Sequence, residues 1–378
     1  MKLKCLKLRR NVLLPIFGLN LICFMIIFLE NVKFFQLAIL TETKLPTTTA
    51  LTAVPTTTTT INPTLARKLE KIKVDLNDSQ LTQETMFPWR NIGRYLMLDP
   101  YLCKRGVESL DIILIVHTAP ANLHRRQRIR ETFGNESFFL PFRIRVAFLL
   151  GKTQNKTLER VLWFEHVTYN DTVMGDFLDS YYNLSIKGVM GYRWVSQYCS
   201  NSKYVFKIDD DVIVNMFKLL YSFYNHMSGK RKSIFCNLWY KGTMPILRSG
   251  KWKVESNVFA KYKTFPFDYC SGFVVIMTTD LMRPMYLAAQ NTPGFWIDDV
   301  YLFGMLPHVV GGVTYYNYAL NKNLTLDVKT AINCTKAEGP KCGIVASVTP
   351  DNDFWGYWQL IKNMYASESW NVENKVVI

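Results

Sequence analysis

The sequence predicts an α/β domain with a mostly parallel sheet flanked by helices, preceded by one transmembrane helix and a Thr-rich stalk. Three observations predict this organisation. An uncharged segment follows a basic N-terminus, a run rich in Thr and Pro comes next, and apolar strand patterns then alternate with helical ones. Hydrophobic residues make up 49% of the 378 residues, which is ample for a core and excludes wholesale disorder.

The N-terminus predicts a membrane anchor. Five Lys and Arg residues within 1–10 precede an uncharged run at 11–29, whose length matches about one hydrocarbon core at roughly 1.5 Å per residue. No small-x-small cleavage site follows, so we expect the segment to be retained. Because basic residues stay on the cytosolic side, we predict a cytosolic tail at 1–10, a stem at 30–85 and a lumenal catalytic domain at 86–378.

The stem and the cysteines agree with a lumenal location. Residues 41–64 contain twelve Thr and three Pro, a composition typical of an O-glycosylated stalk or an unmodified linker. Seven Asn-x-Ser/Thr sequons lie beyond the anchor. Six cysteines lie in the predicted domain, and an even number in an oxidising compartment indicates disulfides. Cys334 and Cys342 are close enough in sequence to pair with each other.

The net charge of +15, taken alone, would suggest a polyanionic partner such as nucleic acid. No regular stripe of Lys and Arg interleaved with aromatic residues is visible in the sequence. A basic surface together with the targeting segment explains the charge better, and we expect no nucleic-acid partner.

Strand and helix patterns alternate within the domain. Residues 111–119 form a continuous apolar run, as buried parallel strands do, and 124–133 follow with a helical pattern. A second strand is predicted at 142–151, a long amphipathic helix at 176–199, and a third strand at 203–208. This order implies a parallel sheet whose ligands bind at the carboxyl ends of the strands.

Three adjacent carboxylates, Asp209, Asp210 and Asp211, follow the third strand. A calcium loop of the EF-hand type would need Gly and Glu where the chain has Val214 and Leu220, and a turn or cap would need only one Asp. A divalent cation bound by one or two carboxylates and by a substrate's phosphates would offset their repulsion. The sequence has neither GxxxxGK[ST] nor GxGxxG, so a nucleotide-sugar donor fits best.

Six segments resemble, in order, those of the β-1,3-galactosyltransferase family. They are RQRIRETF (126–133), EHVTYNDTVMGDFLDSYYNLSIKG (165–188), KYVFKIDDDVIVN (203–215), PILRSGKWKV (245–254), YCSGFVVIM (269–277) and IDDVYLFG (297–304). The resemblance covers about residues 110–305. It implies a GT-A-like (Rossmann-like) fold, a type II membrane protein of the Golgi, a requirement for Mn²⁺, and inversion at the anomeric carbon.

The resemblance also suggests residues for the metal site. Asp209 and Asp211 correspond to the family's metal-binding pair, with Asp211 the stronger ligand. Asp209 and Asp210 would also contact the donor ribose or support the ligands. Related folds often complete the metal site with a C-terminal His, and His308 is the only His beyond residue 230. A lone His is more often structural than a ligand.

A second acidic pair, Asp298 and Asp299, supplies the expected catalytic residues. An inverting transfer needs a base that takes the proton of the acceptor hydroxyl. By the resemblance Asp299 is this base and Asp298 orients it. The alternative is that both acids merely start a helix, where negative charge is favoured.

The basic residues have two interpretations each. Arg126, Arg130 and Lys187 would bind the donor's phosphates, or the arginines would pair with neighbouring acids such as Glu131 and the lysine would be solvated. Trp252 would stack on a sugar or lie in the core, and we expect the core.

The predicted function is transfer of a hexose, most simply galactose from UDP-galactose, in β-1,3 linkage to a sugar of a glycoprotein or glycolipid. One alternative is transfer of N-acetylglucosamine or N-acetylgalactosamine, and another is a carbohydrate-binding relative without activity. The chain has Phe133 where the family has Trp and Val274 where it has Gly. Since that Gly admits close backbone approach, Val274 is the main support for the inactive alternative.

Overall fold

The structure is a computed structural model that describes residues 93–367. The predicted tail, anchor and stem all lie outside this range, as do the first residues of the predicted domain. Within 93–367, no helix combines the length and the apolar character that crossing a membrane requires.

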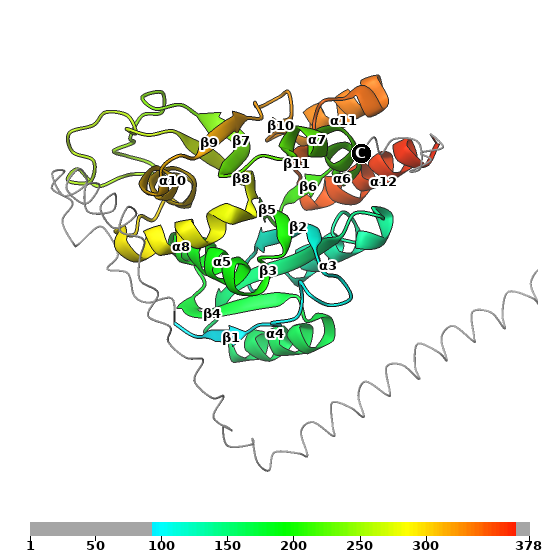
Figure 1. The fold of residues 1–378 in the computed structure, drawn as a ribbon, viewed down its shortest axis with the longest axis horizontal. Helices are drawn as coiled ribbons and strands as arrows, with labels where there is room; N and C mark the ends of the chain where they lie inside the picture. The colour runs from blue at the N-terminus through cyan, green and yellow to red at the C-terminus, as the bar shows by residue number, and fades with distance from the viewer. Residues whose placement is uncertain (1–92, 368–378) are drawn as a thin grey trace, which may run out of the picture. The chain divides into compact units, whose positions relative to one another are not determined.

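An eight-stranded sheet forms the centre of the fold (Figure 1). Its strands are β1 (Tyr95–Met97), β2 (Leu110–His117), β3 (Ile144–Lys152), β4 (Thr172–Leu178), β5 (Ser202–Asp209), β7 (Ser233–Trp239), β8 (Tyr269–Thr278) and β9 (Thr314–Asn317). They follow one another from the bottom to the top of the view in the order β1-β4-β3-β2-β5-β8-β7-β9. The central strands β4, β3, β2 and β5 are parallel, whereas β1 and β8 pair antiparallel with their neighbours. The predicted parallel sheet is therefore correct for the centre, and the complete sheet is mixed.

A smaller sheet joins the large one at the acidic trio. It consists of β10 (Leu324–Thr325), β11 (Ala346–Val348) and β6 (Val212–Val214). Asp210 and Asp211 are the only residues between β5 of the large sheet and β6 of the small one. The chain thus passes from one sheet to the other at the carboxylates.

Helices cover both faces of the large sheet. They are α3 (Leu123–Glu131), α4 (Lys156–Tyr169), α5 (Leu184–Tyr198), α6 (Met216–Lys218), α7 (Tyr224–Met227), α8 (Met282–Asn291), α9 (Asp298–Val300), α10 (Leu306–Val310), α11 (Val328–Glu338) and α12 (Asp351–Ser367). Side chains of α5, α8 and α10 share one core, and those of α3, α11 and α12 share another. Figure 1 labels these helices.

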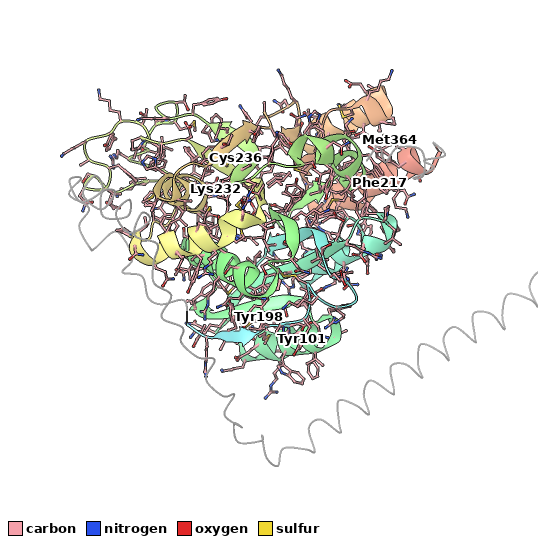
Figure 2. All side chains as sticks on the ribbon, in the orientation of Figure 1. Tyr101, Tyr198, Phe217, Lys232, Cys236 and Met364 are labelled. Carbon is pink, nitrogen blue, oxygen red and sulfur yellow. A yellow bond between two sulfur atoms is a disulfide. The ribbon has the colours of Figure 1, made fainter. Side chains whose placement is uncertain are left out.

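The two cores explain why the central strands are apolar throughout. In β2, Ile113 and Ile115 enter the core beneath α5, whereas Ile112 and Leu114 enter the core beneath α3 and α12. Successive side chains of a strand point to opposite faces, so a strand covered on both sides needs apolar residues at every position. Figure 2 labels Tyr198, which packs against the first core, and Phe217 and Met364, which pack against the second.

Most of the predicted elements are present. The strands at 111–119, 142–151 and 203–208 correspond to β2, β3 and β5, and the helix at 124–133 corresponds to α3. The helix predicted at 176–199 is wrong in its first third. Residues up to Leu178 belong to β4, where pairing with β3 and β1 outweighs the helical spacing of the apolar side chains, and the helix begins at Leu184.

Six cysteines of the described residues form three disulfides. Cys334 pairs with Cys342, as predicted, and the other two bonds join Cys103 to Cys199 and Cys236 to Cys270. The first of these links the chain before β2 to the end of α5, and the second links β7 to β8.

Candidate active site

A cleft of about 1220 Å³ opens at the carboxyl ends of β2 and β5. Asp209 and Asp211 lie on one part of its wall, and Asp298 and Asp299, which begin α9, lie on another. Parallel strands place the residues that follow them at one edge of a sheet, which is where ligands of α/β proteins bind. The structure therefore brings the two predicted acidic groups to one cavity.

The three carboxylates of the trio have different surroundings. Asp210 is buried and accepts hydrogen bonds from Thr118 Oγ1 at 2.6 Å, Asn122 Nδ2 at 2.8 Å and Arg125 Nη1 at 3.0 Å. Asp210 also lines the cleft, and its engagement by Thr118, Asn122 and Arg125 fits the supporting role, one of the two predicted for it.

Asp209 and Asp211 keep oxygens available to the cleft. Their side chains are 40% and 42% exposed, respectively. The nearest cation to Asp211 is Arg125, whose Nη1 lies 3.9 Å from Oδ2. Desolvation and the neighbouring carboxylates raise the pKa of both groups above the ordinary range. A bound cation would relieve this repulsion.

The residues present fit a cation that is completed by its substrate. No three His, Cys, Asp or Glu side chains of 93–367 are grouped as a metal site. The exposed carboxylates of Asp209 and Asp211 in the cleft are oxygen ligands of the kind that a divalent cation would use if it took its other ligands from phosphates and water. The prediction for His308 is wrong, because this residue lies exposed on α10 with its ring 6.0 Å from that of Phe267, apart from the described cleft wall.

Lys207 is a central residue that the sequence analysis missed. Its Nζ donates to Asp209 Oδ1 at 2.7 Å and to the Gly272 carbonyl at 2.6 Å, and its side chain is almost completely buried. Burial alone would lower the pKa of this ammonium, but the carboxylates of Asp209, Asp298 and Asp299 outweigh burial and raise it. Lys207 is thus a fixed cation between the two acidic groups.

The carboxylate of Asp299 lies in a notch at Gly272, which exists because glycine has no side chain. Burial and the adjacent Asp298 raise the pKa of Asp299 to about 7, although Lys207 and the N–H of Gly272 act in the opposite direction. A Cβ atom at Gly272 would lie 1.9 Å from Asp299 Oδ1. A carboxylate that titrates near neutrality is suited to accept a proton at physiological pH.

We expect Gly272→Ala to displace Asp299 and to lower the rate of the predicted sugar transfer by about 100-fold, because small misplacements of catalytic groups have effects of this size. Transfer by the variant is to be compared with that of Gly356→Ala, since nothing lies within 4 Å of a Cβ at that position. Equal rates for the two variants would show that the notch has no role in placing Asp299.

Arg126 and Arg130 were predicted to bind the donor's phosphates, but neither of them contacts the cleft. All five N–H groups of Arg126 are used: two donate to the carboxylate of Glu165, and three to Thr118 Oγ1 and to the carbonyls of residues 119 and 120. Arg130 donates to Glu165 Oε1 and to both oxygens of Asp171. The arginines therefore bind α3 to α4, and Arg126 also fixes the cleft segment after β2.

Lys187 lies in the cleft wall, as its predicted role requires. Its buried Nζ donates to the Thr118 carbonyl at 2.6 Å and to Asp179 Oδ1 at 3.1 Å. Burial lowers the pKa of Lys187, and the carboxylates of Asp179, Asp210 and Asp209 oppose this effect. It is the one of the three predicted donor-binding cations that lines the described cleft.

His117, at the end of β2, is a second residue that the sequence analysis missed. Its side chain lines the cleft, and neither ring nitrogen has a hydrogen-bond partner among the described residues. Burial, together with the charges of Lys207 and Lys187, lowers the pKa of His117 well below the ordinary value, so the imidazole is neutral.

The residues that depart from the family pattern are structural. Phe133 is buried against Phe354, and Val274 is buried opposite Ile208 in the β5–β8 pair, apart from the described cleft wall. Val274 therefore does not narrow this cleft, and the inactive alternative loses its main support. Trp252, expected in the core, is instead 49% exposed in the cleft wall.

Residues 124–317, just over half of the chain, match the family model described as Galactosyltransferase. The chain belongs to the galactosyltransferase family. Human beta-1,3-galactosyltransferase 1 is 32% identical to this family member over 229 residues, which cover 60% of the chain and 68% of the relative. Human lactosylceramide 1,3-N-acetyl-beta-D-glucosaminyltransferase is 30% identical over 230 residues, which cover 58% and 59%, respectively.

Among solved structures, a galactosyltransferase in complex with donor and acceptor sugar analogs is 10% identical to this galactosyltransferase-family chain. The match covers 68% of the chain and 95% of the other protein with a TM-score of 0.33.

Proposed function

We propose that this member of the galactosyltransferase family is a Mn²⁺-dependent inverting enzyme. It transfers galactose from UDP-galactose in β-1,3 linkage to a sugar of a glycoprotein or glycolipid. One observation carries the proposal: the carboxylates of Asp209 and Asp211 and the carboxylate of Asp299 line the same cleft. An inverting displacement needs the leaving group and the base on opposite sides of the anomeric carbon, which such a cleft allows.

Each side chain of the cleft has a separate role in the proposed transfer. Asp299 takes the proton of the attacking acceptor hydroxyl, and its pKa of about 7 leaves it ionised at slightly alkaline pH. Lys207 holds Asp209 toward the cleft and offsets the charge of both acidic groups. Lys187 offsets negative charge on the donor's diphosphate. Mn²⁺, held by Asp209 and Asp211, would stabilise that diphosphate as it leaves.

The identity of the transferred sugar has a second candidate. The similarity to a lactosylceramide N-acetylglucosaminyltransferase is almost as high as that to beta-1,3-galactosyltransferase 1. Transfer of N-acetylglucosamine from its UDP derivative is therefore the alternative, with the same metal ligands and the same base.

We also propose that the protein is a single-pass type II protein of the Golgi membrane. The basic residues before 11–29, the Thr-rich segment 41–64 and the sequons support this location. The three disulfides fit an oxidising lumen.

The test of the proposed function combines binding with transfer. We expect UDP and Mn²⁺ together to stabilise the purified chain by about 2.7 kcal/mol at a UDP concentration 100 times the Kd, and Asp211→Asn to remove most of this gain. Thermal unfolding measures the binding. Incubation with UDP-galactose, UDP-N-acetylglucosamine and UDP-N-acetylgalactosamine then identifies the donor. Stabilisation by glycans but not by UDP, without transfer from any donor, would contradict the proposal.

A further inference from the structure

Four aromatic side chains, here called the aromatic wall, stand beside the catalytic cleft: Tyr181, Tyr182, Trp252 and Trp296. They come from three separate segments, which are the turn between β4 and α5, the connection from β7 to β8, and the chain just before α9. Tyr182 is 59% exposed, and Tyr181 and Trp252 are nearly half exposed. Exposed apolar groups that gather in this way mark binding surfaces more often than isolated ones do.

The members of the aromatic wall touch one another in a continuous row. Trp252 Nε1 donates to the Tyr181 hydroxyl at 3.1 Å, which fixes the orientation of both rings. The ring centroids of Tyr181 and Tyr182 are 6.0 Å apart, and those of Tyr182 and Trp296 are 5.3 Å apart. The four rings therefore form one surface built from distant parts of the sequence.

Polar contacts fix the conformation of the loop that carries Trp252. The exposure of the Trp252 side chain therefore follows from the conformation of an ordered loop. Gly250 has a φ of 79°, which turns the chain just before the tryptophan, and the N–H of Val254 donates to the Leu247 carbonyl at 2.7 Å. Arg248 Nη1 donates to the carbonyls of Glu255 at 2.6 Å and Val258 at 2.9 Å. These contacts present Trp252 to the cleft without burying it.

The aromatic wall lines two hollows that share Lys251. Tyr181 and Trp252 line the catalytic cleft, whereas Tyr182 and Trp296 line a second hollow of about 320 Å³. Lys251 lines both, with its Nζ 5.1 Å from the ring centre of Tyr181 and 5.2 Å from that of Trp252. Trp296 lies three residues before Asp299, the proposed base, in the same segment of the chain.

We propose that the aromatic wall binds a second sugar of an oligosaccharide acceptor, the one that precedes the sugar receiving the hexose. This inference rests on the proposed function, because it assumes that the acceptor hydroxyl reacts at Asp299. A pyranose has apolar C–H faces that pack on aromatic rings, and Tyr and Trp combine an apolar ring with a polar group. The hydroxyls at the edge of the sugar would meet Lys251.

The polar lining of the second hollow favours a sugar over a lipid chain. Lys251, Lys253 and Glu255 contribute to its wall alongside the aromatic rings. A hydrocarbon chain in this position would desolvate charged groups without compensation. A sugar would exchange hydrogen bonds with them and place its C–H face on the rings.

The test compares two acceptors with the full-length protein. One is methyl β-N-acetylglucosaminide, and the other is a tetrasaccharide that ends in the same β-linked sugar. We expect Trp252→Ala to raise KM for the tetrasaccharide about 10-fold and to leave KM for the monosaccharide and for the UDP-sugar within about two-fold. Trp252→Phe should recover most of the loss. Trp163→Ala is the matched control, since Trp163 on α4 is 53% exposed against 49% for Trp252 and lies apart from the described walls of both hollows.

An equal rise in KM for both acceptors, or no rise for either, would overturn the subsite. A measurement without turnover separates this outcome from failure of the proposed function. We expect the tetrasaccharide to quench tryptophan fluorescence of Asp299→Asn in a saturable way, and Tyr182→Ala, which keeps every tryptophan, to weaken this binding about 10-fold. If the tetrasaccharide quenches the fluorescence but the unaltered protein transfers no sugar, the proposed function is contradicted and the subsite is supported. If the unaltered protein transfers sugar but the tetrasaccharide causes no quenching, the subsite is contradicted and the proposed function is supported.

Discussion

Asp299→Asn is expected to abolish sugar transfer and, at the same time, to make the folded protein more stable above pH 7. The loss follows from the removal of the proposed base, because general-base catalysis contributes about 10² to 10⁴ in rate. The amide keeps the shape of the carboxylate, so the binding of UDP should change little. Initial rates and a UDP titration on the same preparation measure the two effects.

The gain in stability follows from the raised pKa of Asp299. At low pH the carboxyl is protonated in both the folded and the unfolded state, and it has no effect on their balance. Between about pH 4, where an ordinary Asp ionises, and about pH 7, only the unfolded state releases the proton, so stability falls as pH rises. Above pH 7 the folded state bears the full cost of a charge beside Asp298.

Asparagine removes this cost, which we place on the order of 1–2 kcal/mol for a partly hydrated carboxylate. The melting temperature of Asp299→Asn should therefore exceed that of the unaltered protein at pH 8 and approach it at pH 5. Asp353→Asn, at an exposed position of α12, serves as the control and should show no such trend. A stability difference that does not depend on pH, or near-normal transfer by Asp299→Asn, would argue against the role of this residue.

Lys207→Met should be the most destabilising single change in the cleft, by about 3–5 kcal/mol, because it removes the buried cation from among three carboxylates. The methionine fills a similar volume, so the loss reports charge more than packing. At pH 5 more of the carboxylates are protonated, and the loss should be smaller than at pH 8. Urea unfolding at the two pH values measures both effects.

The matched control is Lys203→Met on the same strand. Lys203 pairs with Asp111 Oδ1 at 2.8 Å, but its side chain is 57% exposed, and exposed pairs contribute less than about 1 kcal/mol. If the two variants unfold at the same urea concentration, the buried cation does not stabilise the acidic groups.

The sequence predicted best those elements whose residue pattern has only one structural explanation. Strands β2 and β5 lie between two cores, so their apolar runs have no competing interpretation. The segment 176–199 combined the end of a strand, one turn and a helix. Its aromatic residues have a helical spacing, but two of them, Tyr181 and Tyr182, belong to the aromatic wall. No pattern in the local sequence separates a binding surface from a buried helix face.

The same distinction applies to the site. The cleft position of Asp209, Asp211, Asp298 and Asp299 followed from motifs that contain both acidic groups. Arg126 and Glu165 lie 39 residues apart on different helices, and the sequence alone could not show that every donor of Arg126 is used. Lys207 was visible as a charged residue between the apolar Phe206 and Ile208 of a strand, which was a usable signal for a functional cation.

Asp209 and Asp211 belong to different layers of the protein. The first ends a strand of the large sheet, and the second accepts a hydrogen bond at its carbonyl from the N–H of Thr349, next to the small sheet. A cation that bound both carboxylates would therefore crosslink the two sheets. Sliding of one layer past the other would spread the two ligands apart, so occupancy by the ion and rigidity between the sheets must rise and fall together.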